Sequence, residues 1–69
     1  MSPEKLVMMA NQIGKFFAGQ PHEDASAAIA DHLKKFWEPR MRAQILDHLA
    51  KGGAGLDPLV QKAVRSLKA

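Results

Sequence analysis

The stretch FWEPRMR, residues 36–42, contains the break between two predicted helices. Pro39 disfavours a helical conformation at Glu38, and its fixed φ suits the first turn of the helix that follows. One helix therefore ends at this point and another begins with Arg40 and Arg42 in its first turn. The helix dipole places partial positive charge at that end, so it opposes both arginines, and their position needs a separate explanation.

Prolines mark the start of every predicted helix. They stand at positions 3, 21, 39 and 58, and each precedes apolar residues spaced three or four apart. We therefore predict an all-α fold, a small bundle of four short helices over about 3–18, 21–37, 39–51 and 57–68. Strands are not expected, because no alternating β-branched pattern occurs. Short connections without a linker predict one helical domain over residues 1–69.

Local signals refine these helices. Ser2 is a predicted N-cap, and Asp24 is expected in the first turn of the second helix together with Glu23. Gly14, inside the first helix, predicts the close approach of another backbone. The glycine run at 52–55 is expected to end the third helix. The residues predicted to face the core are Leu6, Met9, Ala10, Ile13, Phe16, Phe17, Ala25, Ala28, Ile29, Leu33, Phe36, Trp37, Met41, Ile45, Leu46, Leu49, Leu59, Val60, Ala63, Val64 and Leu67.

Length and composition point to a protein that works with a partner. A domain of 69 residues has a modest core, and domains of this size often depend on disulfides, a metal or association. Cysteine is absent, which excludes disulfides and thiolate zinc sites. Neither a signal sequence nor an apolar run of about 20 residues occurs, so we expect a cytoplasmic protein that does not span a membrane. The net charge of +3 favours an acidic partner.

Two Asp-His-Leu sequences raise the possibility of a metal site, with His32 and His48 each preceded by an aspartate. The helical period argues against it, because it directs His32 towards apolar neighbours and Asp31 to the opposite side. Each aspartate also has a lysine four residues later, which predicts the exposed ion pairs Asp31–Lys35 and Asp47–Lys51. We expect no metal. Nucleophile–base pairs and phosphate-binding loops are also lacking, so an enzyme is not expected.

The two arginines allow three interpretations. In the first, Arg42 lies along the core and caps the C-terminal carbonyls of a neighbouring helix or pairs with Glu38. In the second, the residues around Pro39 form a protein interface, a kind of surface enriched in Trp, Met and Arg. In the third, the helices on either side of Pro39 form a helix-turn-helix-like nucleic-acid-binding protein. Met8 and Gln12, on the outward side of the first helix, favour the second interpretation. The predicted partner-binding residues are Trp37, Arg40, Met41, Arg42, Met8 and Gln12.

Three stretches resemble a known family: KLVMMANQIGKFF (5–17), DHLKKFWEPRMR (31–42) and GLDPLVQKAVRSL (55–67). They resemble the small delta subunit of cytoplasmic, NAD-dependent, molybdenum-containing formate dehydrogenases. The resemblance implies an accessory subunit without catalytic residues and without a bound cofactor of its own, whose partner is the large (alpha) subunit and not nucleic acid or a membrane. Other subunits of such a complex carry molybdopterin guanine dinucleotide, iron–sulfur clusters and FMN.

The same resemblance implies a role in assembly, through insertion of the molybdenum cofactor or through stabilisation of the complex. A permanent subunit and a maturation factor both remain open. Under this hypothesis Trp37 and Met41 anchor on the large subunit. Arg40 and Arg42 then engage carboxylates of that subunit, or a phosphate of the cofactor.

Overall fold

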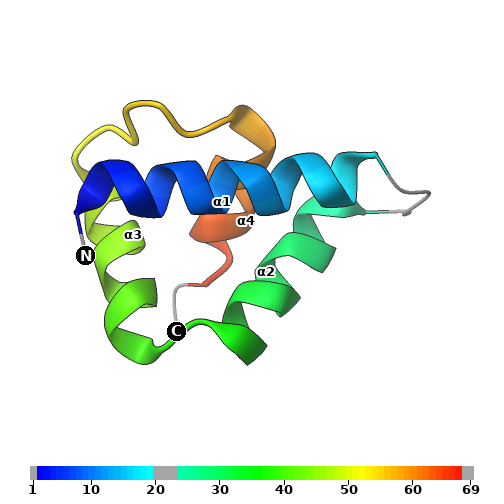
Figure 1. The fold of residues 1–69 in the computed structure, drawn as a ribbon, viewed down its shortest axis with the longest axis horizontal. Helices are drawn as coiled ribbons and strands as arrows, with labels where there is room; N and C mark the ends of the chain where they lie inside the picture. Colours follow the sequence, from blue (N-terminus) through cyan, green and yellow to red (C-terminus); the bar gives the residue numbers. More distant parts are fainter. Residues whose placement is uncertain (1, 20–23, 68–69) are drawn as a thin grey trace.

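Four helices make up the computed structural model, which describes residues 2–19 and 24–67. They are α1 (Pro3–Ala18), α2 (Ala25–Phe36), α3 (Pro39–Ala50) and α4 (Pro58–Arg65). In Figure 1, α1 lies across the top, α3 and α2 lie below it on the left and right, and α4 occupies the middle. Both α1 and α4 pack against α2 and α3 and against each other. No strand occurs in residues 2–19 and 24–67, and the all-α prediction is confirmed.

The start of α2 differs from the prediction. Asp24 is not in the first turn but is the N-cap, with an extended backbone, and its Oδ1 accepts hydrogen bonds from Ala27 N at 3.2 Å and Ser26 Oγ at 2.7 Å. An aspartate that satisfies these donors stabilises the helix start at its own position, so the helix begins at Ala25. The predicted start at Pro21, with Glu23 in the first turn, lies outside the described residues.

The other helix ends agree closely with the prediction. Ser2 caps α1, accepting a hydrogen bond from Lys5 N at 3.3 Å. Glu38 before the proline is extended, as predicted, and α2 ends at Phe36. The third helix ends at Ala50, one residue before the predicted end. The fourth ends at Arg65, with Ser66 as its cap, so it is shorter than the predicted 57–68, of which position 68 lies outside the described residues.

Glycines end α3 through a Schellman motif. Gly52 N donates to Leu49 O at 3.0 Å, and Gly53 N donates to His48 O at 2.9 Å. Both glycines have positive φ, +118° and +65°, which side chains disfavour. The glycine run therefore ends the helix, as predicted, and turns the chain towards α4.

The core draws on all four helices and on the connection before α4. Its buried apolar residues are Leu6, Ala10, Ile29, Ala30, Leu33, Trp37, Ile45, Leu56, Val60, Ala63 and Val64. Two residues predicted to face the core do not: Phe16 is 61% exposed and Phe36 is 71% exposed. Phe16 lies at the edge of the apolar arc of α1, which such a small domain does not cover in full. On α2 the buried face is centred on Ser26, Ile29, Ala30 and Leu33, so it is rotated away from Phe36.

Gly14 is buried where α1 meets α4. A Cβ at this position would lie 2.5 Å from Val60 Cγ2, so any side chain here would collide with α4. The predicted close approach therefore exists, but the neighbouring group is a side chain and not a backbone.

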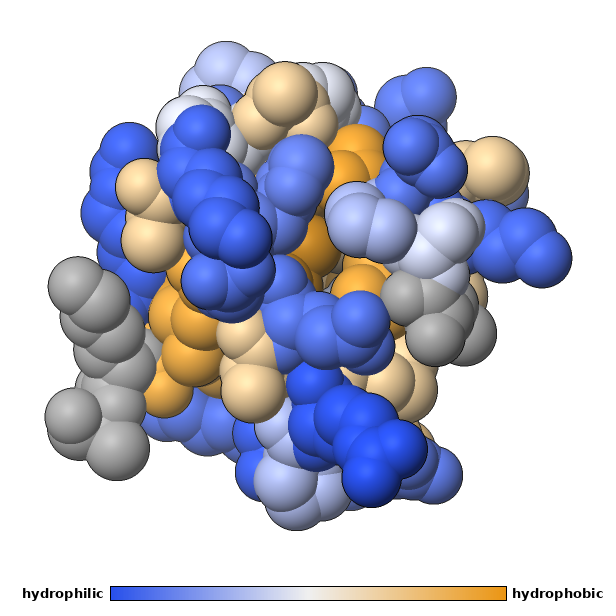
Figure 2. Space-filling model, turned by 90° about the vertical axis from the view of Figure 1, so that its left-hand side faces the viewer, coloured by the Kyte–Doolittle hydropathy of each residue, from blue (hydrophilic) through white to orange (hydrophobic). Residues whose placement is uncertain are grey.

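Asn11 ties α1 to the connection between α3 and α4. Its Nδ2 donates to Gly55 O at 2.9 Å, and its Oδ1 accepts from Asp57 N at 3.0 Å. The connection runs along α1 in Figure 1, and the amide of Asn11 holds two of its backbone groups against that helix. On the face seen from the α3 side, hydrophilic side chains cover most of the surface, and the most hydrophobic groups show mainly in the hollows between them (Figure 2).

Candidate partner-binding surface

The residues around Pro39 do not form one exposed patch. Trp37 is only 6% exposed and belongs to the core, and Met41 packs against that core with part of its surface buried. Arg42 is half-buried, and Arg40 is exposed at the start of α3. Trp37 therefore offers little surface to a partner, because its burial is already used to hold α2 in the fold.

The contacts of Arg42 explain why an arginine stands in the first turn of α3. Its Nη1 donates to the carbonyl oxygen of Lys34 at 3.1 Å and to that of Trp37, both at the C-terminal end of α2. A helix C-terminus carries partial negative charge and unpaired carbonyl groups, so the guanidinium is favoured there although it stands in the first turn of α3. This contact confirms the capping interpretation for Arg42, and it also fixes the angle between α2 and α3.

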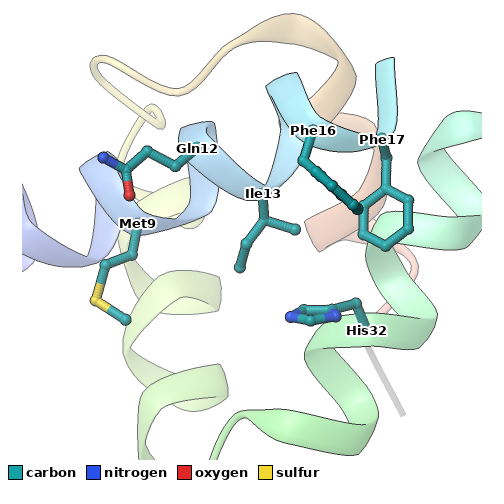
Figure 3. Close-up of a pocket in the computed structure, with 6 residues that line it drawn as sticks. All are labelled: Met9, Gln12, Ile13, Phe16, Phe17 and His32. Carbon is teal, nitrogen blue, oxygen red and sulfur yellow. The ribbon is translucent and has the colours of Figure 1, made fainter. Parts of the chain in front are cut away.

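Met8 and Gln12 are exposed on α1, as predicted, and Gln12 borders a pocket of about 330 Å³. The residues that line this pocket are Met9, Gln12, Ile13, Phe16, Phe17 and His32. Figure 3 shows Ile13 projecting from α1 towards the side of α2 where His32 lies below Phe17, while Met9 projects from α1 on the side of α3. The lining is apolar apart from the amide of Gln12 and the imidazole of His32, which is typical of a site that accepts an apolar group.

Four rings form a continuous line beside this pocket, which we call the aromatic ladder: Phe16, Phe17, His32 and Phe36. Successive ring centroids lie 5.3 Å, 5.7 Å and 4.7 Å apart. These distances fall within or near the range for favourable aromatic pairs. Phe17 and His32 are half-buried in the middle of the ladder, whereas Phe16 and Phe36 at its two ends are exposed. The ladder thus joins the end of α1 to the end of α2 as one aromatic strip that is exposed at its two ends and half-buried in the middle.

The sequence contained a signal for this strip. Phe16 adjoins Phe17, and Phe36 adjoins Trp37. Phe16 and Phe17 are neighbours on α1 and point about 100° apart, so the two rings do not both fit inside a small core. Trp37 follows the end of α2 with an extended backbone, so its side chain also points away from that of Phe36. In each pair the second residue turns towards the core and the first turns outward. The periodicity alone placed all of these aromatic side chains inside, and that assignment was wrong for Phe16 and Phe36.

The two Asp-His sequences have separate surroundings. His32 lies in the ladder, whereas His48 Nε2 is 2.8 Å from Ala54 O. The predicted ion pairs are confirmed, with Lys35 Nζ 3.1 Å from Asp31 Oδ2 and Lys51 Nζ 2.9 Å from Asp47 Oδ2. Within the described residues no group of three or more His, Asp or Glu side chains is arranged to hold a metal ion. None of the helices described is long and apolar enough to cross a bilayer.

One comparison with known proteins identifies relatives of this chain. The family described as the NADH-dependent formate dehydrogenase delta subunit FdsD has a model that matches residues 5–64. This range includes α1, α2 and α3 apart from the first residues of α1, and most of α4. No curated protein and no solved structure matches the chain.

Proposed function

Because the chain belongs to the family of NADH-dependent formate dehydrogenase delta subunits, its partners are other subunits of that complex, and we propose that it is a non-catalytic accessory subunit that binds the large subunit. In this role it supports assembly of a cytoplasmic complex, insertion of the molybdenum cofactor, or stability of the finished enzyme. Iron–sulfur clusters are held by cysteine thiolates, and this chain has no cysteine. The chain therefore has no thiolates for such a cluster, and in this proposal the clusters, the molybdopterin guanine dinucleotide and the FMN belong to the other subunits, as the family resemblance implies.

One observation carries this proposal: three large apolar side chains remain in solvent. Met8 is 57% exposed, and the two outer rings of the aromatic ladder are more exposed still. Single exposed apolar residues are normal, but here Phe16 lines an apolar pocket and Phe36 stacks beside His32, which lines the same pocket. Exposed aromatic and methionine side chains are typical of the energetic centres of protein interfaces. A surface of this kind supports binding to another protein subunit.

The predicted contact residues change accordingly. Met8, Gln12 and Arg40 stay in the proposal because they are exposed. Trp37, Met41 and Arg42 act in it indirectly, since Trp37 fills the core, Met41 packs against it and Arg42 caps α2. In this form the interface is centred on α1 and α2 rather than on the residues around Pro39.

The test is native purification of a tagged form from cells that express the whole complex. We expect the large subunit to elute with the chain, identified by mass, and the molybdenum content to distinguish two roles. Recovery with molybdenum indicates a permanent subunit, and recovery of a molybdenum-free large subunit indicates a maturation factor. Recovery of no dehydrogenase subunit, or binding to duplex nucleic acid with a steep salt dependence, would contradict the proposal.

A further inference from the structure

We propose that the aromatic ladder binds an amphipathic helix of the large subunit whose apolar side chains are flanked by carboxylates. This inference rests on the proposed function, because it names the part of the large subunit that the chain recognises. It has two components, an apolar strip that receives the helix and a basic edge that selects its charge.

The shape of the apolar strip fits a helix. The ladder runs from the last turn of α1 to the last turn of α2, and the pocket opens beside its Phe16–Phe17 end. An extended strip with one pocket suits an element that presents side chains at three- and four-residue steps, with one of them inserted as an anchor. Met9 lines this pocket, and a flexible thioether adapts to the anchor.

The fold itself does not need the two outer rings. In each adjacent aromatic pair the other member supplies the inward contact: Trp37 is in the core, and Phe17 packs against it. Phe16 and Phe36 touch their ladder neighbours but remain mostly in solvent. These rings would stabilise an interface if another surface covered them, because burial of apolar area is the main favourable term in association.

The charges beside the ladder favour an acidic partner. Lys15 precedes the Phe16 end of the ladder, and Lys34 and Lys35 precede the Phe36 end. The one nearby carboxylate on α2, Asp31, forms an exposed ion pair with Lys35. At the Phe36 end Asp31 and the exposed Glu38 offset the two lysines, so the positive charge of the ladder lies mainly with Lys15 at its Phe16 end, and the chain as a whole carries a net charge of +3. A partner with carboxylates beside its apolar face is therefore complementary, whereas a second copy of this chain would bring lysines against lysines.

The test measures affinity for the large subunit, with the complex reconstituted from full-length chains. We expect the double variant Phe16→Ser/Phe36→Ser to bind at least about 30-fold more weakly, because it removes both exposed anchors. The double variant Lys15→Glu/Lys35→Glu should also bind more weakly. The affinity of the wild type should fall between about 0.1 M and about 1 M salt, where screening shortens from about 10 Å to about 3 Å, and the affinity of the lysine variant should fall less.

Matched controls separate binding from folding. Arg65→Glu reverses a charge in the last turn of α4, as Lys15→Glu does in α1, but it lies away from the ladder and should bind like the wild type. Circular dichroism of each variant checks that the helices remain. A photoreactive residue in place of Phe16 should cross-link to a helix of the large subunit that carries carboxylates.

Each contrary result is distinguishable. Wild-type affinity in the ladder variant, or a cross-link to a segment without carboxylates, overturns this inference and leaves the proposed function intact. Self-association that the ladder variant abolishes, with unchanged binding to the large subunit, would assign the ladder to a second copy and also overturn it. Failure of the wild-type chain to bind the large subunit overturns the proposed function and this inference together.

Discussion

Replacement of Arg42 by methionine should destabilise the fold, while the same replacement of Arg40 should not. Methionine keeps most of the aliphatic stem but removes the guanidinium that donates to the carbonyls of Lys34 and Trp37. Hydrogen bonds to charged groups contribute about 1.5–3 kcal/mol, and the bond to Lys34 is exposed, so we expect a loss near 1.5 kcal/mol. For a domain of this size that corresponds to a fall in Tm of about 6–12 °C.

The assay is thermal unfolding followed by circular dichroism and by the fluorescence of Trp37, which is the only tryptophan in the chain and lies in the core. Arg40→Met is the matched control, since it changes the same residue type two positions earlier, at an exposed side chain. We expect its Tm to stay near that of the wild type. Equal Tm values for the two variants would refute the capping role of Arg42, because only one of them loses a contact with α2.

Three further predictions concern single contacts. Gly14→Ala should destabilise by about 1 kcal/mol in chemical denaturation, because the collision with Val60 outweighs the better helix propensity; in a Val60→Ala background the same change should be neutral or stabilising. Asn11→Ala should cost about 1–2 kcal/mol and speed hydrogen exchange at the amide of Asp57, and an unchanged exchange rate would contradict the role of this bond. The hydroxyl of Ser26, and then the amide of Ala27, lower the pKa of Asp24. The stability that the ionised Asp24 gives to the fold is therefore fully present above the unfolded-state pKa, and it is lost as the pH falls through the folded-state pKa. Denaturation at several pH values should therefore show a smaller acid-induced loss of stability in Asp24→Ala than in the wild type.

Local features of the fold could be predicted because their causes lie within a few residues. Pro39 sets the break between α2 and α3, and Ser2 caps α1 through a donor three residues away. The ion pair Asp31–Lys35 joins residues one turn apart on a single helix. Such interactions depend only on helical geometry, so the printed sequence is enough to infer them.

The candidate site was harder to predict because it depends on what the core leaves uncovered. Met8 and Gln12 were placed on the surface correctly, since they fall outside every apolar arc. Phe16 and Phe36 fall inside such arcs, and only the packed structure shows that the core does not extend to these two rings. Periodicity gives the direction of a side chain relative to its own helix, but not the extent of the surface that meets it.

The sequence by itself determined that this chain forms helices and where α1 and α3 begin, because prolines, caps and apolar spacing act locally. It also determined which family the chain resembles, because that resemblance is a matter of matching residues. Only the tertiary structure decided that Arg42 caps α2, that Asn11 binds backbone groups 44 and 46 residues away, and that four rings from two helices form one ladder. The physical reason is that these contacts join groups on different helices. They exist only once packing has fixed the positions of the helices relative to one another.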